Sequence, residues 1–523
     1  MKLTLLDSSL RDGTQGESIS LLEDDKLKII DVLDTLGISY IEAGNPASNP
    51  KDAELFRKLK NRPMKHSVIC AFGSTRRKNI SAEEDFGLKA LLSAETKAVS
   101  IVGKSSLMQV REVLRTSPEE NLAMIRETID YLKSKGKFVI FDAEHFFDGY
   151  MEDDKYAMAS LEAAKNADIL CLCDTNGGTY TKEIFEITKK VCETFADKEI
   201  GIHCHNDCGL AVANSMFAVE AGASHIQGTF LGFGERCGNA VLSTLIPNLQ
   251  IKRGHNCIPE ENLHLLTSAA RRIADVANFS LPGSRPYIGK SAFAHKGGMH
   301  IDGVTKQSSS FEHIDPALVG NHRRFLLSEM SGKTTLMSRI HAIDPTIERS
   351  DKKVEEIIEE LKLREMSGYQ FEGADGSFDL IIRRKLGLMP TFFHLDYFKI
   401  LGEQPMLSSE YPSSAVMKVR VGSETEITAA EGNGPVNALD LALRKALMRF
   451  YPKLSEMRLT DFKVRVLESD ATTAATVRVL IESSDGRNRW STIGVSPDVI
   501  GASFIALRDS VEYKLMLDDL AKK

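Results

Sequence analysis

Eight short apolar runs recur through the first half of the chain, and they constrain its fold more than any other feature. The runs are rich in Val, Ile, Leu and Cys, and the segments between them carry apolar residues three and four positions apart, as amphipathic helices do. The predicted strands are 3–6, 39–43, 66–71, 98–102, 138–142, 168–173, 200–204 and 225–230. Eight apolar strands covered by helices predict an α/β fold, a (β/α)8 TIM barrel of about 250 residues, and an open doubly wound sheet is the alternative.

The rest of the 523-residue chain has a different pattern. Helical and loop-like segments such as 263–278 and 354–366 follow the barrel and indicate a linker region of small subdomains. From about residue 411 a strand–turn–helix unit occurs twice, with strands at 415–421, 462–467 and 475–481 and helices at 438–450 and 502–515. Such a repeat predicts a pseudo-symmetric α+β domain that packs against itself or a second chain, and a dimerisation module alone is the other interpretation.

Composition favours a protein that handles metabolites. Lys and Arg total 66 against 73 Asp and Glu, and the net charge of −7 predicts no nucleic-acid or anionic-membrane partner. The chain shows no signal-peptide pattern and no apolar stretch of the ~18 residues that a membrane span needs, so the expected compartment is the cytoplasm. The eight cysteines form no CxxC pair, and we interpret Cys171 and Cys173 as reduced core residues.

Polar residues cluster where the apolar runs end. The clusters are 7–17, 42–45, 142–145, 174–177, 203–207 and 234–239. In a barrel of parallel strands these positions all face one mouth, where loops vary over a rigid frame and active sites lie.

Two histidines in one of these clusters suggest a metal site. His203 and His205 are two residues apart at the end of a predicted strand, so alternation points both imidazoles to the same face. Asp12 follows the first strand, which neighbours the last in a closed barrel, and Asn239 follows the eighth. Two nitrogens with carboxylate and amide oxygens suit Zn²⁺, Mn²⁺ or Co²⁺, and Mg²⁺ if water completes its shell.

Three further residues suggest what the metal could act on. Arg11, beside Asp12, could stabilise the alkoxide that forms when the ketone of a 2-oxo acid is attacked. The hydroxyl of Thr175 could hold the carboxylate of that acid or cap the next helix. His300 lies in the Gly-rich segment 294–303, where it is either a base for a thioester methyl group or a surface histidine.

The sequence resembles the group of 2-isopropylmalate, homocitrate and citramalate synthases. Leu10-Arg11-Asp12-Gly13-Thr14-Gln15 is similar to the group's first-strand motif, and His203-Cys204-His205-Asn206-Asp207 with Gly-Glu-Arg-x-Gly-Asn at 234–239 is similar to its second. The segments 71–77 and 295–298 look most like the citramalate synthase branch. One departure is Ser8-Ser9, where the group usually has Thr-Thr, and serine keeps both hydroxyls.

The resemblance covers nearly the whole chain and implies roles for residues at matching positions. The implied metal ligands are Asp12, His203, His205 and Asn239, the implied catalytic residues Arg11, Glu144 and His300, and the implied substrate-binding residues Arg11, Thr175, Gln15 and Glu42. Because the group places the linker of one subunit over the barrel of its partner, the resemblance implies a homodimer in which His300 acts in trans.

Gly432-Asn433-Gly434-Pro435-Val436 looks like the signature of the group's regulatory domain. The predicted division is therefore 1–285 for a catalytic barrel, 286–405 for linker subdomains and 406–523 for a C-terminal regulatory and dimerisation domain. For the citramalate synthase branch, the expected effector of such a domain is isoleucine.

The activity implied by the resemblance is that of an acyltransferase. It would condense acetyl-CoA with pyruvate and water to give citramalate and CoA, in the first step of a pyruvate route to isoleucine. The same chemistry on a larger 2-oxo acid is the nearest alternative, because one methylene in an apolar pocket is worth only ~1–3 kcal/mol. A metal-dependent hydroxyacyl-CoA lyase is a more distant one. Arg76 and Arg77 are candidates for holding the CoA phosphates.

Overall fold

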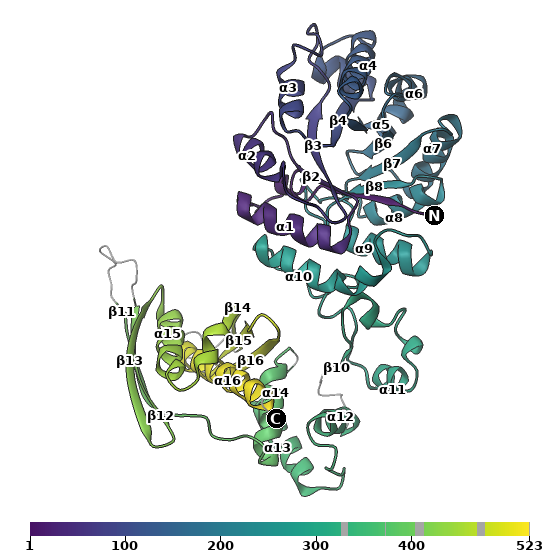
Figure 1. Ribbon diagram of the computed structural model, residues 1–523. Coiled ribbons are helices and arrows are strands. Elements are labelled where there is room, and N and C mark those ends of the chain that lie inside the picture. The colour runs from purple at the N-terminus through teal and green to yellow at the C-terminus, as the bar shows by residue number, and fades with distance from the viewer. Residues whose placement is uncertain (326–332, 372, 403–412, 468–475, 522–523) are drawn as a thin grey trace. The chain divides into compact units, whose positions relative to one another are not determined.

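The computed structural model describes residues 1–325, 333–371, 373–402, 413–467 and 476–521. The chain forms two compact units (Figure 1). The first unit is Met1–Ala294 with Glu312–Arg324, and the second is His295–Phe311 with Phe325–Lys523.

The first unit is a closed barrel of eight parallel strands in sequence order, which confirms the predicted (β/α)8 TIM barrel. Its strands are β1 (Thr4–Asp7), β2 (Tyr40–Gly44), β3 (Val68–Ser74), β4 (Ala98–Lys104), β5 (Phe138–Glu144), β6 (Ile169–Asp174), β7 (Glu199–Cys204) and β8 (His225–Gly228). Pairing of β1 with β8 closes the barrel, with Thr4 opposite His225 and Asp7 opposite Gly228. Asp12, beyond β1, is thereby brought beside the end of β8.

Helices surround this barrel. They are α1 (Glu23–Leu36), α2 (Pro50–Leu59), α3 (Phe86–Ser93), α4 (Pro118–Ser134), α5 (Phe146–Glu152), α6 (Asp154–Ala163), α7 (Thr181–Thr194), α8 (Ala211–Glu220), α9 (Leu242–Pro247) and α10 (Leu266–Val276), with the short helical segments η1 (Gly13–Gln15), η2 (Gln109–Leu114), η3 (Asn248–Lys252), η4 (Glu260–Leu265) and η6 (Pro316–Val319). Of these, α2, α3, α4 and α6 each begin with a side-chain cap. The longest, α4, begins where the Ser117 hydroxyl accepts from the Glu120 amide and Pro118 opens the first turn. The predicted helix 263–278 corresponds to the end of η4 and α10.

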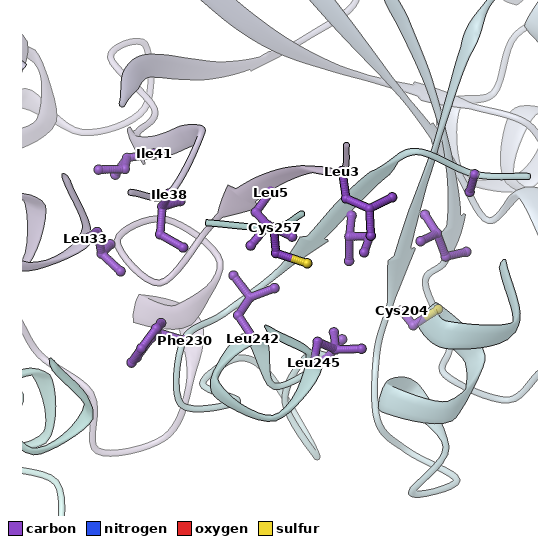
Figure 2. Close-up of a cluster of buried hydrophobic side chains, with 14 of the residues drawn as sticks. Leu3, Leu5, Leu33, Ile38, Ile41, Cys204, Phe230, Leu242, Leu245 and Cys257 are labelled. Atoms are coloured by element: carbon purple, nitrogen blue, oxygen red, sulfur yellow. The ribbon is translucent and has the colours of Figure 1, made fainter. Parts of the chain in front are cut away.

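Alternation along the strands separates two apolar layers. Leu3 and Leu5 belong to the large core that includes the surrounding helices, and Figure 2 shows them in one cluster of buried side chains with Leu242 and Leu245. Leu6 belongs instead to a small cluster that fills the barrel interior. The other buried members of that cluster are Cys70, Ala98, Ile140, Ile169, Cys171 and Cys173. Cys171 and Cys173 are thus buried free thiols of the core, as predicted.

The second unit begins with helical segments. These are α11 (Gly298–Lys306), η5 (Ser308–Ser310), α12 (Lys333–Ile343), α13 (Lys352–Met366) and α14 (Asp375–Leu386), with the short strands β9 (Ala294–His295) and β10 (Arg324–Phe325) where the chain passes from one unit to the other. Buried apolar residues of α12, α13 and α14 form one cluster, in which Ile340, Ile357 and Ile382 are fully enclosed. The predicted helix 354–366 is α13.

Two β-β-β-α repeats follow, which confirms the predicted α+β domain. The first consists of β11 (His394–Gly402), β12 (Ser413–Val421), β13 (Glu424–Gly432) and α15 (Pro435–Met448); after η7 (Pro452–Glu456), the second consists of β14 (Arg458–Val466), β15 (Val477–Ser484), β16 (Arg489–Ser496) and α16 (Val499–Leu520). Each set of three strands forms an antiparallel sheet. Of the predicted strand 475–481, residue 475 lies outside the described residues. The sequence analysis missed β11, β13 and β16. None of the helices described is long and apolar enough for a bilayer crossing.

Candidate active site

Three potential metal ligands meet at the carboxyl end of the barrel. Nε2 of His203 lies 3.6 Å from Oδ2 of Asp12, and Nε2 of His205 lies 3.9 Å from the same oxygen. One ligand atom from each of the three residues lies within 4.8 Å of the other two, and all three side chains are buried. His203 is on β7, His205 follows it directly, and Asp12 precedes η1. A single divalent ion can be reached by all three.

The protonation states of these groups suit metal binding. Burial lowers the pKa of His203, and burial with the neighbouring imidazole lowers the pKa of His205 to about 4. Both rings are therefore neutral near pH 7, the form that binds metals. Burial opposes ionisation of Asp12, but the charged Arg11 guanidinium beside it lowers the pKa of this carboxyl all the same.

Asn239 completes the group of candidate ligands. It forms an antiparallel bridge with His205, and its Nδ2 donates to the carbonyl oxygen of Phe233 at 3.0 Å. Its Oδ1 is buried and has no hydrogen-bond partner among the described residues. An orphaned amide oxygen next to a carboxylate and two neutral imidazoles fits a divalent cation that takes mixed nitrogen and oxygen ligands.

Glycines of the Gly-Glu-Arg-Cys-Gly-Asn loop give Asn239 its position. Gly234 has φ +146°, and a Cβ there would lie 2.3 Å from Nδ2 of Asn239. Gly238 has φ +81°, and a Cβ there would lie 2.0 Å from the carbonyl oxygen of Gly232. Both positions exclude any residue with a side chain unless the loop moves.

Arg11 is fixed beside the candidate ligands. Its Nε donates to Oε2 of Glu42 at 2.7 Å, and its guanidinium carbon lies 3.8 Å from the centre of the Phe72 ring. The Ser8 hydroxyl donates to the same Glu42 oxygen at 2.6 Å. Glu42 is fully buried and therefore holds Arg11 in place, while the nearest Arg11 nitrogen lies 3.5 Å from Asp12.

The remaining predicted residues of the barrel lie on the same rim. Glu144, at the end of β5, pairs with Lys104 at the end of β4. The Thr175 hydroxyl accepts from the backbone amide of His145 at 2.8 Å, and His145 has the strained backbone angle φ +56°. Gln15 is exposed on η1, three residues beyond Asp12.

His300 lies in the second unit, on α11. Its side chain is exposed, and its ring stacks on Phe311 with 4.2 Å between ring centres. Its catalytic role stays a prediction.

The role suggested for Arg76 is wrong. Its guanidinium is buried and already pairs with Glu120 at 2.8 Å and Glu127 at 2.6 Å. Two carboxylates satisfy this cation inside the helical layer, so it is not available to a phosphate. Arg77 is largely exposed, and a role in binding CoA stays a prediction for it.

Sequence reasoning missed several residues of the site, namely Lys104, Phe72, Ser100 and Gln227. It also missed the contact of Ser8 with Glu42. Each lies on a barrel strand or just beyond one, with its side chain on the inward face. The available signal was strand parity: Gln227 is two residues beyond His225 on β8, as His203 is two residues beyond Gly201 on β7. A polar residue of that parity near the carboxyl end of a barrel strand points to the mouth.

A second group of possible ligands, Asp142, Cys171 and Cys173, also comes within 4.8 Å. Burial raises the pKa of the Cys171 thiol well above its ordinary value, so it is protonated and a poor ligand. Asp142 is already engaged by Ser100 and Gln227. This group is better explained as core packing below the site.

Three family models match the sequence in succession. The HMGL-like model matches residues 2–273, the model for the homocitrate synthase post-HMGL domain matches 287–367, and the model for the LeuA allosteric (dimerisation) domain matches 372–515. The first alone covers more than half of the chain.

Individual relatives match the chain from end to end. An (R)-citramalate synthase from Aquifex aeolicus is 48% identical over 520 residues, which are 99% of this chain and 98% of the relative. One from Geobacter sulfurreducens is 46% identical over 513 residues, which are 98% and 97% of the two chains. A probable 2-isopropylmalate synthase from Methanosarcina mazei is 30% identical over 512 residues, 97% and 94% of the two chains. The chain, which joins an HMGL-like barrel to a LeuA allosteric (dimerisation) domain, belongs to the (R)-citramalate synthase family.

Proposed function

We propose that this chain is an acyltransferase that condenses acetyl-CoA with pyruvate and water to give (R)-citramalate and CoA. The observation that carries the proposal is the convergence of Asp12, His203 and His205 beside a fixed Arg11, in a chain of this family. In the reaction, the acetyl methyl carbon bonds to C2 of pyruvate, and water then cleaves the thioester and releases CoA.

The residues of the barrel mouth divide into two tasks. Asp12, His203, His205 and Asn239 would hold a divalent ion, Zn²⁺, Mn²⁺, Co²⁺ or Mg²⁺, which when bound supplies Lewis-acid polarisation of the pyruvate ketone. Arg11 stabilises the negative charge that develops on the same oxygen, because Glu42 and Phe72 hold its guanidinium in one orientation before the substrate arrives.

Thr175 holds the pyruvate carboxylate in this proposal. Its hydroxyl oxygen already accepts from the His145 amide, so its proton is free to donate to an incoming anion. Gln15, exposed on the same rim, is a second donor within the mouth.

Proton transfer is assigned to His300 and Glu144 on the strength of the family resemblance. His300 removes a proton from the acetyl methyl group, directly or through water, and Glu144, paired with Lys104, is the acidic residue of the centre. The exposed imidazole of His300 is accessible for such a role.

Substrate choice is supported by the pattern of relatives. Five (R)-citramalate synthases are 40–48% identical to the chain, whereas two probable 2-isopropylmalate synthases are 30% identical, as is one putative (R)-citramalate synthase. The whole-length match, which includes the LeuA domain, also favours a synthase over a lyase built from the barrel alone.

The experiment that tests the proposal measures CoA release with a thiol reagent. Pyruvate, 2-oxobutyrate, 2-oxoisovalerate and 2-oxoglutarate are compared at equal acetyl-CoA, with and without a chelator. We expect kcat/KM for pyruvate to exceed the others by at least about tenfold, activity to vanish with chelator, and added metal to restore it. Preference for a larger 2-oxo acid would place the enzyme in another branch of the family, and full activity after metal removal would contradict the metal site.

We also propose that the C-terminal domain makes the enzyme a homodimer with an allosteric site for isoleucine. The match to the LeuA allosteric (dimerisation) domain supports the dimer and the regulation, and the identity of the effector comes from the resemblance. Titration of isoleucine, leucine and valine into the assay tests this: inhibition by isoleucine at the lowest concentration is expected, and a stronger effect of leucine would contradict it.

A further inference from the structure

A chain of buried hydrogen bonds leads away from the metal ligand His203. Its Nδ1 lies 3.2 Å from Oε1 of Gln227, and Nε2 of Gln227 donates to Oδ1 of Asp142 at 2.7 Å. The other Asp142 oxygen accepts from the Ser100 hydroxyl. The four side chains come from the neighbouring strands β4 and β5 and from the neighbouring strands β7 and β8, and all are at most 6% exposed.

The ionised carboxylate of Asp142 sets the direction of these hydrogen bonds from the far end. Burial raises the pKa of Asp142 to about 7, and in the ionised form both of its oxygens accept, so the Gln227 side chain turns its NH₂ toward Asp142 and its oxygen toward His203. An oxygen can only accept, and His203 therefore carries its proton on Nδ1. The lone pair is then on Nε2, the nitrogen that faces Asp12.

We propose that Gln227 is a positioning residue that holds His203 in the tautomer and ring orientation required to bind the divalent ion. The proposal rests on the metal site of the proposed function. Outer partners of this kind fix a metal-binding imidazole, and their loss typically costs 10–100-fold in metal affinity.

The second imidazole provides a contrast within the same site. Nδ1 of His205 is buried but has no hydrogen-bond partner in the part of the chain that the structure describes. His203 is therefore the ligand that is oriented before the metal arrives, and His205 adjusts to the ion.

The test measures the dissociation constant for Co²⁺ and Zn²⁺ by competition with a chromophoric chelator, together with the visible spectrum of bound Co²⁺. Gln227→Met keeps the side-chain volume but removes both hydrogen bonds, and we expect affinity to fall about 10–100-fold with a changed Co²⁺ spectrum. Gln227→Glu keeps an acceptor toward His203, and its other oxygen can share one proton with Asp142, whose pKa burial already raises to about 7, so we expect affinity within about fivefold of the wild type.

A matched control is Gln250→Met. Gln250, on η3, is likewise a glutamine held by side-chain hydrogen bonds, in its case three bonds to the backbone of Cys257 and Ile258. Its loss is expected to lower the unfolding temperature but leave the metal affinity and the Co²⁺ spectrum unchanged.

The outcomes separate this proposal from the proposed function. If the wild-type protein binds no divalent ion, the metal site itself fails. If the wild type binds one and Gln227→Met binds it within about threefold as tightly, the positioning role is overturned. Should Gln227→Met fail to fold, Gln227→Glu decides the question: retained affinity supports the role, and a hundredfold loss despite the retained acceptor overturns it.

Discussion

Arg11 shows how several weak contacts fix one functional side chain. Its guanidinium pairs with buried Glu42 and stacks on Phe72, so a lysine there keeps the charge but loses both the Nε donor and the planar face. We expect Arg11→Lys to lower kcat about 10²–10³-fold, the usual cost of losing an oxyanion donor, with little change in metal content. Steady-state kinetics and metal analysis check this.

Arg62→Lys is the matched control, because Arg62 also pairs with a carboxylate, that of Asp31, but on the surface. It is expected to leave kcat unchanged. A kcat for Arg11→Lys within threefold of the wild type would exclude Arg11 from charge stabilisation.

Asp7 should make the stability of the barrel depend on pH. Burial raises its pKa to about 7 from an ordinary value of 3.8, and its Oδ2 has no hydrogen-bond partner among the residues described. The folded state therefore keeps a proton that the unfolded state releases, so this contribution is complete below about pH 4 and is lost as the pH rises through about 7. Its size is at most about 4 kcal/mol.

Asp7→Asn removes this titration while keeping the acceptor for the Ser9 amide. Between pH 4 and 8 the unfolding temperature of the variant should fall less steeply with pH than that of the wild type. Equal slopes in calorimetric scans would mean that Asp7 is ionised in the folded protein.

Residues that carry their own motif could be found in the sequence, and residues that act through packing could not. His203, His205, Asp12 and Arg11 are polar groups where apolar runs end, and the barrel closure brings them together. Gln227 lies on the short strand β8 and belongs to no motif. Arg76 was misjudged because its partners Glu120 and Glu127 lie more than 40 positions away, on α4.

At the scale of elements, the loop between β8 and α9 is the most constrained part of the site. Gly238→Ala would place a Cβ 2.0 Å from the Gly232 carbonyl oxygen, so the loop must shift and take Asn239 with it. We expect weaker metal binding, by about tenfold or more, because one ligand is displaced. Chelator competition measures this.

Gly254→Ala is the control variant, because it tests the cost of a side chain at positive φ without the steric clash that Gly238→Ala introduces. Gly254 has φ +71°, close to the +81° of Gly238, but a Cβ there meets nothing within 4 Å. It should cost about 1 kcal/mol of stability and leave metal affinity unchanged. Equal metal affinity in the two variants would show that the loop does not hold a ligand.

The barrel strands are buried on both faces, and the sequence revealed all of them. Strands such as β6 and β7 are largely apolar runs, and alternation then indicates which residues face the mouth. β12, β14 and β15 were also predicted, although they are not buried on both faces. β13, in contrast, is Glu424–Gly432 with only small or polar residues besides Ile427, and it is buried at a single position. β11 lies at the edge of its sheet with an irregular register, so its apolar residues show no period. The sequence does not show which strands pair, so strands of this kind cannot be told from loops in it.

At the scale of the whole molecule, α14 connects two parts of the second unit. It packs with α12 and α13 on one side and contacts the second repeat of the C-terminal domain on the other. The Ser377 hydroxyl donates to Asp509 at 2.8 Å and accepts from the Ile493 amide at 3.0 Å, while Arg384 pairs with Asp509 and Glu512. These buried polar contacts join α14 to β16 and α16 into one structural element. A conformational change in the repeat would therefore reach the apolar cluster of α12, α13 and α14 by way of a packed helix.

The resemblance assigns His300 to the barrel of the partner subunit, and mixed dimers can test that assignment. His203→Ala destroys the metal site of its own barrel, and His300→Ala removes the proposed base, so each homodimer should be inactive. In a mixed dimer that works in trans, one of the two sites combines an intact barrel with an intact His300. Random assortment makes half of the dimers mixed, so co-expressed variants should recover about a quarter of wild-type activity per dimer. Enrichment of the mixed dimer with two different tags should raise this to about half.

If His300 served its own barrel, no combination would contain a complete site, and activity would stay at the level of the separate variants. The control is either variant co-expressed with itself, which should give that same low activity.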